Sequence, residues 1–115
     1  MNTFKNSLIQ LTQYGMGGGD EQLSLVLLNN YLRLLNEEEE LPRVIVFYNA
    51  GVKLICKGSP VLEALNALQE RGVRLLACKT CLNHFKLMEQ METGIGGTMM
   101  DIIELQKVAD KVISL

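Results

Sequence analysis

The stretch Val44-Ile45-Val46-Phe47-Tyr48 decides the fold class of this chain. Every residue in it is apolar or aromatic and most are β-branched, which is the composition of a strand buried on both faces. Strands of this kind occur in parallel sheets, because the helices that connect parallel strands cover both faces of the sheet. The stretch therefore predicts a parallel sheet enclosed by helices.

Strand and helix signals alternate on both sides of this stretch, which indicates a βαβ arrangement. Asp101, with Glu104 three residues later, has the spacing of a capping box and marks the start of the last helix. The predicted strands cover residues 7–11, 44–48, 73–77, 98–100 and 111–115, and the predicted helices cover residues 21–36, 60–71, 82–91 and 102–109.

Composition limits the classes of function. A chain of 115 residues with 48% hydrophobic content fits one domain over residues 1–115. A net charge of -2 supplies no positive surface to hold a polyanion, so no nucleic-acid partner is expected. Apolar runs fall far short of the roughly 20 residues of a membrane span, and residues 1–10 lack the apolar core of a secretory signal. We therefore expect a cytoplasmic protein that does not bind membranes.

The predicted helix over residues 21–36 is apolar around most of its circumference. Asp20 precedes it as an N-cap. One apolar flank is expected to pack on the sheet, and the other on a neighbouring helix or on another subunit. The sheet-facing flank is predicted to contain Leu23, Val26, Leu27, Tyr31 and Leu34, the second flank Leu25, Leu28, Leu32 and Leu35, and the polar strip Gln22, Asn29, Arg33 and Asn36.

The motif Cys78-Lys79-Thr80-Cys81 directly follows a predicted strand. The carboxyl ends of parallel strands border the crevice in which α/β proteins bind their ligands. A helix N-terminus and a nearby lysine lower a thiol pKa, so Cys78 and Cys81 are candidate catalytic nucleophiles and Lys79 a supporting residue. Alternatively, both cysteines are small core side chains.

His84 follows Cys81 by three residues, so a helix would place both side chains on one face. The imidazole would then hold or relay the thiol proton, unless it is simply an exposed polar residue.

A zinc site formed by Cys56, Cys78, Cys81 and His84 is disfavoured, because only one close pair has ligand spacing, and no metal is expected. A thioredoxin-like site is also disfavoured, because both prolines precede the motif.

Gly17, Gly18 and Gly19 form a glycine run before the first helix. Such a run can cradle phosphate, but no complete nucleotide-binding motif is present and Asp20 would repel an anion. A flexible loop beside the crevice is the favoured interpretation, and no cofactor is expected.

Asn49 follows the second strand and is expected to border the crevice with Lys53, or to be a turn residue.

Several blocks together resemble the DsrE-like domain of YedF-type, sulfurtransferase-like selenium-metabolism proteins. The likeness covers residues 7–115. Longer members of that family also carry an N-terminal TusA-like domain, so this chain is similar to the DsrE-like half. The matching blocks are Gly15-Met16-Gly17-Gly18-Gly19-Asp20-Glu21-Gln22-Leu23, Phe47-Tyr48-Asn49-Ala50-Gly51-Val52-Lys53-Leu54, Gly58-Ser59-Pro60-Val61-Leu62, Cys78-Lys79-Thr80-Cys81-Leu82 and Ala109-Asp110-Lys111-Val112-Ile113.

The resemblance implies a three-layer α/β/α fold around a mainly parallel five-stranded sheet, and subunits that associate as a homo-oligomer. It also implies that a cysteine after the third strand, Cys78 or Cys81 here, carries sulfane sulfur, or selenium by analogy. The chain departs from the family pattern at Lys79, at His84 and at residues 96–98, where glycine, an aromatic residue and Val-Thr-Asn are common.

The leading hypothesis is a cytosolic sulfur-relay protein, either a sulfurtransferase enzyme or a sulfur carrier. One thiolate accepts sulfane sulfur as a persulfide, and the neighbouring thiol protects or resolves it. The expected partners are sulfur donor and acceptor proteins, among them a TusA-like carrier. The alternative is a non-catalytic assembly or regulatory subunit with structural cysteines.

Overall fold

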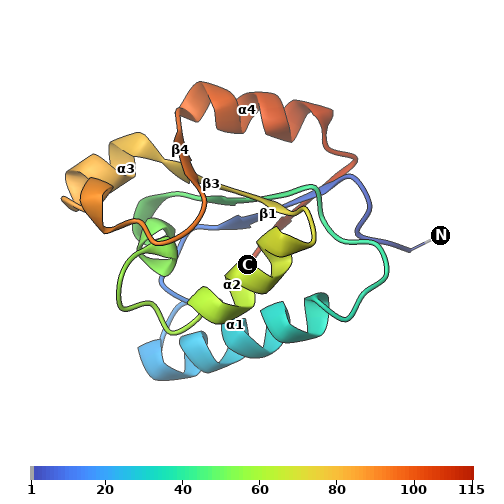
Figure 1. Ribbon diagram of the computed structural model, residues 1–115, viewed down its shortest axis with the longest axis horizontal. Helices are drawn as coiled ribbons and strands as arrows, with labels where there is room; N and C mark the ends of the chain where they lie inside the picture. Colours follow the sequence, from blue (N-terminus) through green and yellow to red (C-terminus); the bar gives the residue numbers. More distant parts are fainter. Residues whose placement is uncertain (1) are drawn as a thin grey trace.

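A computed structural model gives the structure of the protein over residues 2–115. Its five strands form a single sheet in which every neighbouring pair is parallel, in the order β4-β3-β2-β1-β5 (Figure 1). The strands are β1 (Ser7–Leu11), β2 (Val44–Phe47), β3 (Arg74–Cys78), β4 (Ile95–Gly97) and β5 (Lys111–Ser114), and the helices are α1 (Glu21–Leu35), α2 (Leu62–Glu70), α3 (Lys79–His84) and α4 (Met99–Val108), with 3-10 segments η1 (Asn49–Ile55) and η2 (Met88–Gln90).

Helices cover both faces of the sheet, as the buried stretch in β2 predicts. Figure 1 shows α1 and α2 on one face and α4 on the other. Val44 and Val46 of β2 point into the α4 side of the core, whereas Ile45 and Phe47 point into the α1 and α2 side. All four are at most 2% exposed. The α/β fold class with a five-stranded parallel sheet is therefore confirmed.

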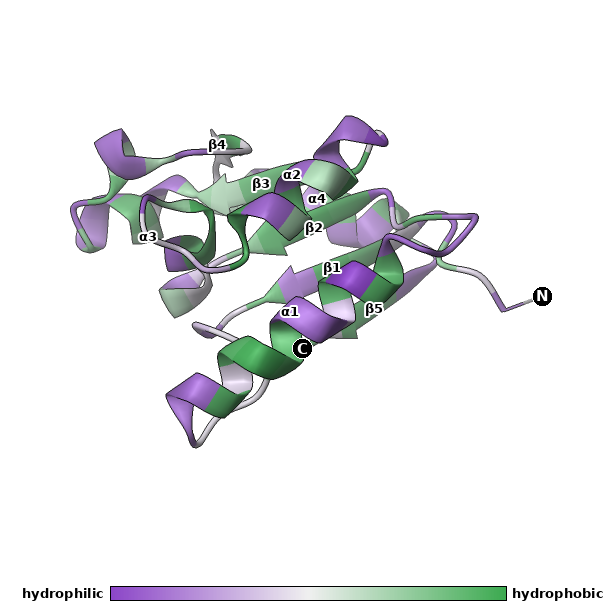
Figure 2. Cartoon of the chain, turned by 60° about the horizontal axis from the view of Figure 1, so that its bottom comes forward, coloured by the Kyte–Doolittle hydropathy of each residue, from purple (hydrophilic) through white to green (hydrophobic). Residues whose placement is uncertain are grey.

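The helix α1 begins at the predicted N-cap, where the Leu23 N–H donates to Asp20 Oδ1 at 2.7 Å. The prediction of its sheet-facing flank was wrong. Leu28 and Leu32 are fully buried against the sheet side, whereas Leu23 is 56% exposed and Leu34 is 64% exposed. Both flanks are strongly apolar, so helical periodicity alone could not choose between them. Figure 2 views α1 from outside and shows much apolar colour along it.

The fourth strand lies at β4, N-terminal to the predicted position at residues 98–100. Thr98 is instead the N-cap of α4 and forms a capping box with Asp101. The Asp101 N–H donates to Thr98 Oγ1 at 3.1 Å, and the Thr98 N–H donates to Asp101 Oδ2 at 2.8 Å. The helix therefore begins earlier than the expected 102–109, because Thr98 is the N-cap and Asp101 takes the N3 position of the capping box. Glycine is a weak strand signal, which hid β4.

The predicted helix over residues 82–91 is also corrected. α3 starts at Lys79, immediately after β3, and ends at His84, and η2 follows separately. Lys86 has φ 59°, a left-handed conformation that cannot continue an α-helix. α3 therefore places its first turn directly at the end of β3.

Gly51 lets η1 cross the carboxyl end of β1. A Cβ at this position would stand 2.0 Å from the Leu11 carbonyl oxygen, so no other residue fits without a backbone shift. The Tyr48 N–H donates to the same oxygen at 3.2 Å. This contact brings the start of η1 over the carboxyl edge of the sheet.

None of the helices in residues 2–115 combines the length and hydropathy that crossing a membrane requires.

Candidate functional site

The two cysteines of the motif lie at the carboxyl edge of the sheet, as predicted. Cys78 is the last residue of β3 and also precedes the first residue of α3, and Cys81 lies in the first turn of that helix. Cys78 and Cys81 come within 3.5 Å of each other. Cys78 is only 1% exposed, whereas Cys81 is partly exposed. Cys81 is therefore the sulfur that an outside reactant can reach.

Asn49 contributes a backbone contact to this site. Its N–H donates to the Cys81 Sγ at 3.1 Å. The residue has φ 54°, a left-handed conformation that asparagine tolerates better than most residues. The contact is made by the main chain of Asn49 and not by its side chain. An N–H in this position stabilises negative charge on sulfur.

The expected lowering of the thiol pKa does not hold for Cys81. Burial raises the pKa of Cys81, and the neighbouring Cys78 raises this pKa further, while the Asn49 N–H acts in the opposite direction. Burial therefore disfavours the thiolate form of Cys81.

Lys79 points away from the thiols. A Cβ on Gly96 would stand 3.1 Å from the Lys79 Cγ, so the lysine stem crosses β4 where glycine leaves room. The ammonium group acts on Asp101, whose pKa is lowered first by the Thr98 backbone N–H, then by the Thr98 hydroxyl, and to a smaller extent by Lys79. Lys79 therefore connects α3 with the α4 side of the sheet.

His84 does not join the thiols. Its ring lies edge-on to Phe85, with centroids 5.1 Å apart and an interplanar angle of 82°. Within residues 2–115 no hydrogen bond links His84 to either cysteine, and the side chain is exposed. The shared helix face therefore does not bring the two groups together, although both residues lie in α3.

Phe85 is a residue near the site that the sequence analysis missed. It packs against the same core cluster as Cys81, four residues away along the chain. Lys53 Nζ lies 4.6 Å from the centroid of its ring, a cation–π contact. The i,i+4 spacing from Cys81 was the available sequence signal. The contact fixes Lys53 over the carboxyl edge.

The glycine run lines a small cavity of about 320 Å³ next to Lys53. The loop is tied to α1, because Ser24 Oγ donates to the Gly17 carbonyl at 3.2 Å and the Met16 N–H donates to the Ser24 carbonyl at 2.9 Å. These bonds connect the start of the glycine run to α1. The cavity is lined by Gln13, Tyr14, Gly17, Gly18, Gly19, Glu21, Ser24 and Lys53.

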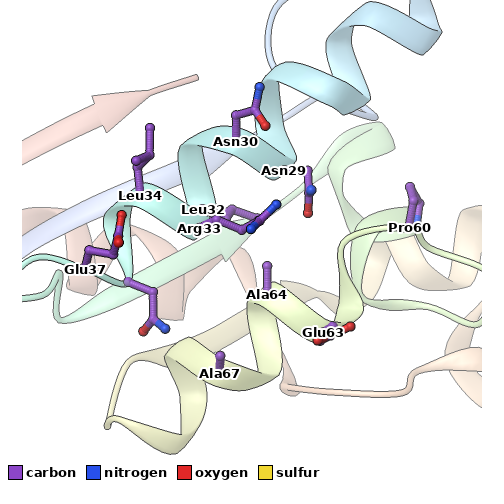
Figure 3. A pocket seen from close by; sticks show the side chains of 11 residues that line it. Asn29, Asn30, Leu32, Arg33, Leu34, Glu37, Pro60, Glu63, Ala64 and Ala67 are labelled. Carbon is purple, nitrogen blue, oxygen red and sulfur yellow. The ribbon is translucent and has the colours of Figure 1, made fainter.

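A larger groove of about 730 Å³ runs between α1 and α2. Figure 3 shows Asn29 and Arg33 of α1 facing Ala64 and Ala67 of α2 across it. No cysteine and no other predicted site residue lines this groove. It therefore does not form part of the thiol site.

The third cysteine is separate. Cys56 is 2% exposed, and its thiol donates to the Val52 carbonyl at 3.2 Å. Over residues 2–115, no three His, Cys, Asp or Glu side chains gather to hold a metal ion. The four-ligand zinc alternative of Cys56, Cys78, Cys81 and His84 is therefore not formed.

These features define a class: a parallel α/β domain with a thiol pair at the carboxyl edge of its sheet. Residues 6–115 match the model of the DsrE/DsrF-like family, and the chain belongs to that family. None of the curated proteins compared matches it.

Solved structures share the fold. The ychN protein from E. coli is similar, with a TM-score of 0.68 and 20% identity over 96% of this chain and 99% of that chain. The protein of unknown function MTH1491 from Methanobacterium thermoautotrophicum has a TM-score of 0.70 and 20% identity, over 95% of this chain and 97% of that chain. The conserved protein BT1422 from Bacteroides thetaiotaomicron has a TM-score of 0.67 and 17% identity, over 96% of this chain and 95% of that chain. At these identities the likeness concerns the fold alone.

Proposed function

We propose that this protein is a sulfur-relay protein in which Cys81 carries sulfane sulfur as a persulfide. The main observation that supports this proposal is the partly exposed Cys81 thiol at the carboxyl edge of the sheet. This thiol already accepts a hydrogen bond from the Asn49 N–H at 3.1 Å. The same N–H would stabilise a thiolate during attack and a persulfide anion afterwards. Membership of the DsrE/DsrF-like family supports this theme.

The chemical step is thiolate attack on divalent sulfur. The Cys81 thiolate attacks the outer sulfur of a donor persulfide, the sulfur–sulfur bond of the donor breaks, and the donor leaves as a thiolate. The raised pKa of Cys81 lowers the fraction of thiolate at neutral pH. It also makes the thiolate that forms more nucleophilic, because nucleophilicity rises with thiol pKa.

The proposed partners are sulfur donor and acceptor proteins, among them a TusA-like carrier, with selenium as a substrate by analogy. The relay needs thiols that stay reduced, which places it in the cytoplasm. Self-association as a homo-oligomer is part of the proposal.

The test is mass spectrometry after incubation with a small persulfide donor, with an alkylating reagent present to trap persulfide. We expect a trapped adduct of one sulfur on Cys81, lost in Cys81→Ser and retained in Cys56→Ser, the matched control for a buried thiol. An adduct of equal yield in Cys81→Ser would reject the assignment.

The second candidate is an assembly or regulatory subunit. Its supporting observation is the outer flank of α1, where Leu23, Val26 and Leu34 are each more than half exposed. Exposed apolar flanks of this kind mark interaction surfaces. Sedimentation of Leu34→Asp and of the wild type would test it, since only an interface makes the variant dissociate.

A further inference from the structure

Cys78 has no access of its own to solvent. It is 1% exposed and packs with Val46, Leu76 and Ile102 on the α4 side of the sheet. A donor protein or a persulfide on another molecule therefore cannot reach it in this structure. The reactive partner within its reach is the thiol of Cys81, because the two residues come within 3.5 Å of each other and their side chains interact.

We infer that Cys78 is the resolving thiol of the site, and that sulfur left on Cys81 without an acceptor is released as hydrogen sulfide. This inference rests on the proposed function, because it begins from the Cys81 persulfide. It adds a second activity, reductive sulfide release, to sulfur transfer. Substrates are then persulfides when an acceptor is present and persulfides plus a dithiol reductant when it is absent.

The step balances. The Cys78 sulfur attacks the inner sulfur of the Cys81 persulfide, a Cys78–Cys81 disulfide forms, and the bond between the inner and outer sulfurs breaks. The outer sulfur leaves with the bonding electron pair and takes the protons as hydrogen sulfide. It is thereby reduced, while the Cys78 sulfur is oxidised and the Cys81 sulfur keeps the oxidation state that it had in the persulfide. A small dithiol then returns the disulfide to two thiols.

The geometry suits this step. A disulfide requires its sulfurs about 2.05 Å apart. Cys78 and Cys81 already come within 3.5 Å of each other and their side chains interact, so the closure that remains is short. Cys56 shows the contrast. It is equally buried, but its thiol is bonded to the Val52 carbonyl, and it therefore has no role in resolution.

The experiment follows the Cys81 persulfide over time with no trap and no reductant, using a small persulfide donor that is removed after loading. In the wild type, the mass gain of one sulfur should decay to a species lighter than the free protein by two hydrogens. One equivalent of sulfide should appear in the same period. In Cys78→Ala the adduct should persist about tenfold longer or more, because the intramolecular attack is lost.

Cys78→Ser and Cys56→Ala complete the test. The first should retain the adduct like Cys78→Ala, and the second should decay like the wild type, each with unchanged circular dichroism. Equal adduct lifetimes in the wild type and both Cys78 variants, with no disulfide and no sulfide, would overturn the inference alone. No adduct in any of them, even with an alkylating trap, would overturn the proposed function and this inference with it.

Discussion

Leu28→Ala tests which flank of α1 faces the sheet. Leu28 is fully buried, so truncation removes roughly three carbons, worth about 2.4 kcal/mol at about 0.8 kcal/mol per buried methylene. The cavity left behind adds to this loss, and buried leucine truncations cost about 2–5 kcal/mol in total. We expect the free energy of unfolding to fall within that range, measured as a lower urea midpoint with an unchanged m value.

The matched variant is Leu34→Ala, on the outer flank of the same helix. Leu34 is 64% exposed, so the same truncation should cost only about 0.9 kcal/mol. Unfolding at two protein concentrations separates folding from association, because only an associating protein changes its midpoint. If Leu34→Ala costs as much as Leu28→Ala at both concentrations, the orientation of α1 described above is wrong.

Three further outcomes follow from the structure. Gly51→Ala should lower the urea midpoint by more than a typical surface change, because its Cβ would stand 2.0 Å from the Leu11 oxygen; a midpoint equal to the wild type would show that η1 does not cross β1 this closely. Asp101 has a lowered folded pKa, so its contribution to stability is present above its unfolded pKa and disappears as pH falls through the folded value. The unfolding midpoints of the wild type and Asp101→Asn should therefore converge in acid, and a constant gap would contradict this. Alkylation of Cys81 in the folded protein should have its pH midpoint above that of the urea-denatured chain, because burial raises the pKa of this thiol, whereas a lower midpoint in the folded state would refute it.

Strands and caps with strong local signals could be predicted from the sequence. The stretch in β2 indicated burial on both faces, and Asp20 indicated the start of α1, and both are confirmed. β4 could not be placed, because its two glycines carry no strand signal. Glycine is required here by tertiary packing, because a Cβ on Gly97 would stand 2.9 Å from the Leu76 side chain.

The positions of the two thiols could be predicted from the sequence, but the direction of the Cys81 pKa shift could not. The order of strand, motif and helix was sufficient to place Cys78 and Cys81 at the carboxyl edge. Charge spacing along the chain could not show that the Lys79 side chain crosses β4, because that direction depends on the room above Gly96. The spacing also could not show that burial is the largest effect on the pKa of Cys81 and raises it. Local spacing therefore located the thiols and could not determine their surroundings.

The cover that α4 provides is thin. Only Ile102 of this helix is buried, whereas α1 buries four residues, Ser24, Leu28, Leu32 and Leu35. Elements held by few buried apolar groups detach transiently at low free energy. Ile102 shares its cluster with Cys78, so each such opening wets the innermost sulfur. Cys78 is thus a native probe of local unfolding. In Cys81→Ser protein, the rate at which a thiol reagent modifies Cys78 reports how often α4 detaches from the sheet.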